Sequence, residues 1–110
     1  MSHTTTVLMY HAVGDEQGAC VGADAHYAVS SLQFSRHLAL VKAAGCQVAS
    51  VASLLAAPAA RQRSVAFTFD DGHCSNGLAA ELIAKQGGSA DFFVNPASVG
   101  TANFLSWSDL

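Results

Sequence analysis

Two adjacent aspartates, Asp70 and Asp71, are the residues whose type and spacing best suit chemistry in this sequence. They follow an apolar run, Val65 to Phe69, and precede Gly72. Two carboxylates this close repel each other unless a proton or a cation is shared between them. A divalent metal removes the conflict by binding one carboxylate and leaving the other free as a general base. The pair therefore predicts a metal site in which one carboxylate is a ligand and the other a base, with a solvated or helix-capping acidic turn as the ordinary alternative.

Strand alternation separates the two carboxylates. Side chains of a strand point to alternate faces, so the bulky residues of the run share one face and the small or polar ones share the face that ends on Asp70. In α/β barrels the inward face carries catalytic groups at the C-terminal ends of the strands. Asp71 reaches the same site only if the chain turns there, and Gly72 accepts the backbone angles of such a turn. Asn76 is expected to cap the following helix.

Other polar residues are expected at the same edge. His11 ends the first predicted strand and Asn95 ends the strand after the motif helix, so both are candidates for the lining of the cleft, together with Gly72. His11 suits a hydrogen-bonded structural role equally well. His73 is a candidate contact for substrate or metal, although an exposed loop residue is the more ordinary interpretation.

The elements that must position these groups alternate between strand and helix. This alternation favours an α/β fold with a parallel sheet. A capping-box pattern at Ser106 to Asp109, with Asp in place of the usual Glu, indicates the start of a further helix. We therefore expect residues 1–110 to form a single, incomplete domain. The predicted strands are 7–10, 47–48, 65–69 and 90–94, and the predicted helices begin near Ser30, Ser50 and Asn76.

Composition excludes several classes of function. The chain is 51% hydrophobic and 12% charged, which suits one globular unit. Its five Lys and Arg residues are scattered and its net charge is -3, so no basic surface for nucleic acid is expected.

No apolar run reaches the roughly 18 residues of a membrane span. No signal peptide is visible, so the chain as given is expected in the cytoplasm, with export still open if the start is truncated. Three Cys without a CxxC pair are expected to be reduced: Cys20, Cys46 and Cys74.

The sequence Thr68-Phe69-Asp70-Asp71-Gly72 resembles the first motif of the polysaccharide deacetylases, carbohydrate esterase family 4. The similarity extends in order along most of the chain and is greatest to the bacterial exopolysaccharide branch, which includes poly-N-acetylglucosamine deacetylases. The resemblance implies the N-terminal part of a distorted (β/α) barrel with fewer than eight strands. The further stretches that carry it are Leu8–His11, Gln33–Gly45, Phe92–Val94 and Leu105–Leu110.

The resemblance also implies an activity, the hydrolysis of N-acetyl groups on a carbohydrate polymer at a carbon–nitrogen bond that is not a peptide bond. It places the base on Asp70 and a ligand for a divalent metal, zinc first, on Asp71. The family's other ligands are a His pair in a second motif, and a later His protonates the leaving amine. No residue up to Leu110 matches these groups. The chain is therefore expected to end before the second motif and to be inactive alone. A non-catalytic relic, or a module for carbohydrate binding or assembly, is the alternative.

One residue departs from the family pattern. Asp91 stands where the family has a threonine that faces the barrel interior. An unpaired buried carboxylate costs several kcal/mol. Asp91 is therefore expected either to have a partner or to indicate a different strand register. The identity of the sugar polymer and the oligomeric state stay open.

Overall fold

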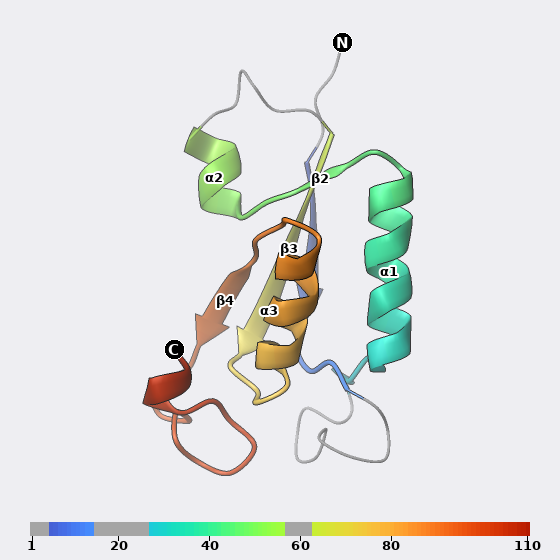
Figure 1. The fold of residues 1–110 in the computed structure, drawn as a ribbon. Helices are drawn as coiled ribbons and strands as arrows, with labels where there is room; N and C mark the ends of the chain where they lie inside the picture. The colour runs from blue at the N-terminus through green and yellow to red at the C-terminus, as the bar shows by residue number, and fades with distance from the viewer. Residues whose placement is uncertain (1–4, 15–26, 57–62) are drawn as a thin grey trace.

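The computed structural model describes residues 5–14, 27–56 and 63–110. Strands and helices alternate along these residues, as the sequence predicts, and every predicted element is present (Figure 1). The chain thus has the α/β class expected for it. The elements are β1 (Thr5–Tyr10), α1 (Ser31–Ala43), β2 (Gln47–Val48), α2 (Val51–Ala56), β3 (Ser64–Asp71), α3 (Asn76–Lys85), β4 (Asp91–Val94) and the 3-10 helix η3 (Trp107–Asp109).

β3 is the central strand of a four-stranded parallel sheet. β1 pairs with β3 over six residues, from Thr5 opposite Ser64 to Tyr10 opposite Phe69. On the other edge of β3, β2 pairs with its beginning and β4 pairs with its end. The C-terminal ends of β1, β3 and β4 therefore lie next to one another.

The hydrophobic core lies between the sheet and the helices α1 and α3. The bulky face of β3 is buried there, as predicted: Phe67 and Phe69 have no exposed surface and pack with Phe34 of α1 and Ile83 of α3. The Tyr10 ring of β1 stacks on both β3 phenylalanines, at centroid distances of 5.7 and 5.5 Å. Burial of each aromatic side chain stabilises the fold by roughly 1.5–3 kcal/mol. This core fixes the position of the β3 end, where the two aspartates lie.

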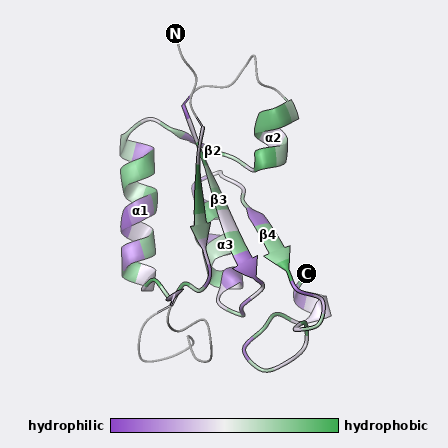
Figure 2. Cartoon of the chain, turned by 180° about the vertical axis from the view of Figure 1, so that it is seen from behind, coloured by the Kyte–Doolittle hydropathy of each residue, from purple (hydrophilic) through white to green (hydrophobic). Residues whose placement is uncertain are grey.

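The opposite face of the sheet is covered at one end only. Ala66 is fully buried there against Leu54 of α2 and Ala49. Toward the C-terminal ends of the strands, Met9 and Phe93 are exposed by 65% and 58%. Figure 2 shows this face, with apolar α2 near one end and the hydrophilic tip of β3 at the other. Asp70 therefore lies on an open part of the sheet.

The predicted helix starts are mostly confirmed. The Ser30 hydroxyl accepts the Gln33 N–H at 3.1 Å at the start of α1, and Ser50 does the same for Ser53 at the start of α2. Asn76 is the exception, because Ser75 occupies the cap position and Asn76 is the first residue of α3. The predicted capping box is present: the Asp109 carboxylate accepts the Ser106 N–H at 2.8 Å, and this bond lowers the pKa of Asp109.

No helix of the described part of the chain is long and apolar enough to cross a membrane.

Candidate functional site

The candidate site begins with Asp70 at the end of β3. Asp70 continues the strand alternation, lies opposite Phe93 of β4, and is half-buried on the open face of the sheet. Within the described residues its carboxylate makes no hydrogen bond or ion pair. A carboxylate that lacks such partners keeps its lone pairs for a proton from outside, which suits a general base. The role of Asp70 stays a prediction, but its placement is the predicted one.

Asp71 turns the chain. Its φ is 79°, and Gly72 follows with a φ of 71°, so two consecutive residues have left-handed backbone angles. The sequence indicates this freedom only for Gly72. Asp tolerates the left-handed region better than most residues, but the conformation still costs roughly 1–3 kcal/mol, and such strain clusters at functional sites. Asp71 Oδ2 lies 3.4 Å from Nδ1 of His11, the residue after β1, so the Asp71 side chain lies toward the end of β1.

His11 lies beside Asp71. Its Nδ1 atom is 3.4 Å from Asp71 Oδ2, with the two side chains 22% and 50% exposed. The Nδ1 atom is buried and has no hydrogen bond within geometric limits. The His11 ring also lies against the Tyr27 ring, at a centroid distance of 5.2 Å. The structure therefore brings together two of the predicted site residues, one from the end of β1 and one from the end of β3.

Asn76, the first residue of α3, bonds to the residue that follows β1, a role that the sequence analysis missed. Its side-chain amide Nδ2 donates to the His11 carbonyl oxygen at 2.8 Å. The other amide atom, Oδ1, is buried and has no hydrogen-bond partner among the described residues. The capping pattern alone suggested a local role, because a partner 65 residues away leaves no signal in the spacing.

His73 is buried, so its interpretation as an exposed loop residue is wrong. It retains only 1% exposure. Its Nδ1 accepts the Ser75 N–H at 3.1 Å and lies 2.8 Å from the Ser75 hydroxyl, which in turn accepts the Val13 N–H at 2.9 Å. Because Nδ1 is an acceptor, the proton of the neutral ring is on Nε2. This network fastens the motif loop to the segment after β1.

Asn95 follows β4 at the same edge of the sheet, since Val94 pairs with Asp71. Its side chain is exposed, and its Oδ1 accepts the Ala97 N–H at 3.1 Å, closing a local turn. A role for Asn95 in lining the cleft stays a prediction. Asp91, at the start of β4, has the partner that it requires: Oδ2 accepts the Val51 N–H at 2.8 Å.

The donor set near Asp71 fits a divalent metal in part. Among the residues that the structure describes, no group of three or more His, Cys, Asp or Glu side chains gathers in one place. Asp71 nevertheless presents a half-exposed carboxylate beside the buried, unpaired Nδ1 of His11. A carboxylate is a suitable ligand for zinc and for harder cations. The described residues therefore offer one carboxylate and a neighbouring imidazole at this place, fewer groups than a protein zinc site uses.

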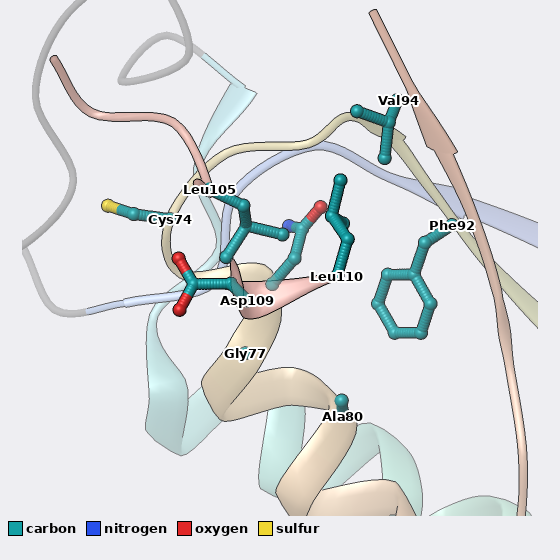
Figure 3. Close-up of a pocket in the computed structure, with 9 residues that line it drawn as sticks. Cys74, Gly77, Ala80, Phe92, Val94, Leu105, Asp109 and Leu110 are labelled. Atoms are coloured by element: carbon teal, nitrogen blue, oxygen red, sulfur yellow. The ribbon is translucent and has the colours of Figure 1, made fainter. Parts of the chain in front are cut away.

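A separate cavity of about 510 Å³ lies between α3, β4 and the C-terminal segment. Figure 3 shows Phe92 and Val94 on its β4 side and Leu105 on the side of the C-terminal segment. Neither Asp70 nor Asp71 lines this largely apolar cavity, so it is separate from the carboxylate pair.

Comparison with known proteins identifies the fold. No family model and no curated protein matches the chain. Solved structures do match: a polysaccharide deacetylase from Bacillus cereus has a TM-score of 0.78 at 24% identity and is matched by 96% of this chain. IcaB from Ammonifex degensii has 0.75 at 25% identity over 98% of this chain. A de-N-acetylase from Aggregatibacter actinomycetemcomitans has 0.75 at 19% identity over 96% of this chain.

The chain spans 34% of the Bacillus structure, 47% of IcaB and 48% of the Aggregatibacter protein. The similarity thus covers almost all of this chain and about a third to a half of each neighbour. The predicted resemblance to polysaccharide deacetylases is confirmed at the level of structure. The predicted fold, the N-terminal part of their (β/α) barrel, is confirmed as well.

Proposed function

Because this chain has the fold of the N-terminal part of the polysaccharide deacetylases, we propose that it supplies the base and one metal ligand for removal of N-acetyl groups from a carbohydrate polymer. The observation that carries the proposal is the β3 end: Asp70 is unpaired on the open face of the sheet, while the strained turn aims Asp71 at His11. One carboxylate is therefore free for a proton, and the other is placed for a cation.

Asp70 acts as the general base in this proposal. It removes a proton from the water that attacks the acetamide carbonyl carbon, and a backbone N–H after the motif helps to stabilise the oxyanion that forms. Collapse of this adduct breaks the carbon–nitrogen bond, and the amine leaves with a proton. Acetate and a free amino sugar result, so that one water is consumed for each acetyl group removed.

Asp71 holds the metal in this proposal, with zinc as the first candidate. When bound, a divalent ion supplies Lewis-acid activation of the water and of the carbonyl. The described residues contain no group of three ligating side chains, so two further ligands are needed, as well as an acid for the leaving amine. We propose that these groups come from polypeptide beyond the described residues, and that the 110 residues alone do not turn over substrate. Chitin oligomers, peptidoglycan and poly-N-acetylglucosamine are the candidate substrates.

The test is acetate release from N-acetylglucosamine oligomers by the gene product that contains this chain, purified with Zn²⁺. Asp70→Asn is expected to lower kcat/KM by at least about 100-fold, the usual contribution of a general base, while zinc content is retained. Asp71→Asn is expected to lower both zinc content and activity. Glu81→Gln, at an exposed position of α3, is the matched control.

Acetate release that survives Asp70→Asn would contradict the assigned base. The absence of a three-ligand group in the described residues gives a second candidate, a non-catalytic carbohydrate-binding or assembly module. That candidate predicts that the protein contains no stoichiometric zinc and releases no acetate. It also predicts that the protein binds the oligomers and that Asp70→Asn does not change this binding.

A further inference from the structure

We propose that His11 is the positioning residue for Asp71, and that its Nδ1–H holds carboxylate oxygen Oδ2 so that Oδ1 is left for the metal. The proposal rests on the proposed function, because it assigns a task within the same site. It goes beyond that function by giving a reason why two adjacent aspartates have different roles. Only Asp71, among the described aspartates, has a histidine ring nitrogen within 4 Å.

The contact between the two side chains carries the proposal. His11 Nδ1 lies 3.4 Å from Asp71 Oδ2, slightly longer than a hydrogen bond, and has no other partner in the described part of the chain. A buried ring nitrogen without a partner is unfavourable, and an N–H···O bond of about 2.9 Å to Asp71 Oδ2 would satisfy it. Carboxylates that bind metals are commonly held by such an outer hydrogen bond.

Both members of the pair are held in place by their backbones. The His11 carbonyl accepts the Asn76 side-chain amide at 2.8 Å, and the preceding residue, Tyr10, is paired with Phe69. Asp71 is fixed by its own left-handed backbone angles and by its pairing with Val94. The imidazole thus lies at the end of β1 and the carboxylate at the end of β3, and these two strands are paired with each other.

The pairing also separates Asp71 from Asp70. Strand alternation puts Asp70 on the open face of the sheet, opposite Phe93, where no described cationic or imidazole group contacts it. In this proposal the His11 imidazole fixes the orientation of the Asp71 carboxylate and leaves that of Asp70 free. A metal ligand needs a fixed direction, whereas a base needs an unoccupied oxygen.

The first measurement is the protonation of the His11 ring in the metal-free chain at pH 7.5. Long-range ¹H–¹⁵N NMR correlations distinguish the Nδ1–H from the Nε2–H form. The proposal expects the proton on Nδ1. A neutral ring with its proton on Nε2 and a bare Nδ1 would overturn it, because the ring would then have no hydrogen to donate to Asp71.

The second measurement is Co²⁺ titration of the ¹⁵N-labelled gene product that contains this chain, because the chain itself offers one metal ligand, and it is read from the amide signals of residues 70–73. His11→Leu is expected to weaken Co²⁺ binding about tenfold, the usual effect of losing an outer hydrogen bond. His11→Asn, whose amide nitrogen stands where Nδ1 stood, is expected to restore binding to within about threefold of the wild type. Asp71→Asn should abolish the response, and Glu81→Gln should not change it.

The outcomes separate the two proposals. If Asp71→Asn abolishes the Co²⁺ response and His11→Leu leaves it unchanged, the role of His11 is refuted and the proposed function stands. If His11→Asn is as weak as His11→Leu while circular dichroism shows both variants folded, a donor at Nδ1 is not the cause and the inference fails. If the wild-type gene product shows no response at residues 70–73, the assignment of the metal to Asp71 fails, and the positioning role fails with it.

Discussion

The Asp91 carboxylate and the Val51 backbone N–H are joined by a hydrogen bond of 2.8 Å, which ties β4 to the first turn of α2. The bond satisfies a carboxylate that would otherwise lie half-buried and unpaired. It also fixes α2 over the small face of β3, where Leu54 packs on Ala66.

Asp91→Ala is therefore expected to lower the free energy of unfolding by about 1 kcal/mol, the usual cost of removing a carboxylate that caps a helix. Asp91→Asn keeps an acceptor oxygen and should lose clearly less. Urea unfolding followed by circular dichroism measures both variants. Equal stability of Asp91→Ala and the wild type would show that the bond contributes nothing in solution.

Gly72 is constrained twice, by a φ of 71° and by the approach of Val94. A Cβ atom at Gly72 would lie 3.2 Å from Val94 Cγ1, whereas a Cβ atom at Gly45, with a φ of 75°, would meet nothing within 4 Å. Gly45→Ala should therefore cost only the left-handed penalty, about 1–2 kcal/mol, and Gly72→Ala should cost more. Urea unfolding of the two variants separates the backbone penalty from the steric one, and equal losses would mean that Val94 moves away freely.

Asp71 stores strain that glycine would release. Asp71→Gly should be more stable than Asp71→Asn by about 0.5–1 kcal/mol, because relief of the left-handed penalty, about 1–2 kcal/mol, exceeds the extra entropy that glycine loses, about 0.5–1 kcal/mol. Both variants lack the carboxylate charge, so their difference in thermal unfolding reports the backbone penalty together with any contact of the asparagine amide with His11. Higher stability of Asp71→Asn would show that the turn is not strained.

Tyr10 makes the fold sensitive to alkaline pH. Burial raises the pKa of its hydroxyl above the ordinary value of 10.0, and the hydroxyl lies 2.7 Å from His37 Nδ1. The unfolded chain therefore loses this proton at a lower pH than the folded chain does. The stabilisation that this difference in pKa provides is fully present below about pH 10. It declines as the pH rises from there through the pKa of Tyr10 in the folded chain.

Tyr10→Phe should remove this part of the loss of stability at alkaline pH. It should also lower the free energy of unfolding at pH 7 by about 1 kcal/mol, because the hydrogen bond is missing. Chemical unfolding at several pH values between 7 and 11 measures both effects. Parallel stability curves for Tyr10→Phe and the wild type above pH 10 would contradict the assignment to Tyr10.

Much of the fold could be predicted from the sequence, because the signals that set the elements are local. The alternation in Val65–Phe69 gave the buried and open faces of β3, and Ser30 and Gly45 marked the ends of the first helix. The placement of Asp70 followed from the same alternation. Short-range periodicity and capping depend on a few neighbouring residues, which the sequence contains in full.

The contacts that build the site could not be predicted in the same way. His73 is buried because the segment around Phe104 returns to pair with it, and a cap pattern cannot reveal that Asn76 bonds to His11. The partner of Asp91 lies 40 residues earlier in the chain. The turn at Asp71 needed a left-handed aspartate as well as the expected glycine. Each of these features depends on segments that meet only after the sheet has formed.

The bond between the Asn76 amide and the His11 carbonyl spans 65 residues. At a translation rate of roughly 5–20 residues per second, His11 leaves the ribosome about 3–13 s before Asn76 does. During most of that interval β1 has neither its β3 neighbour nor the amide that bonds to the residue after it. Any ion that needs the geometry of both His11 and Asp71 is therefore captured only after this segment has been synthesised.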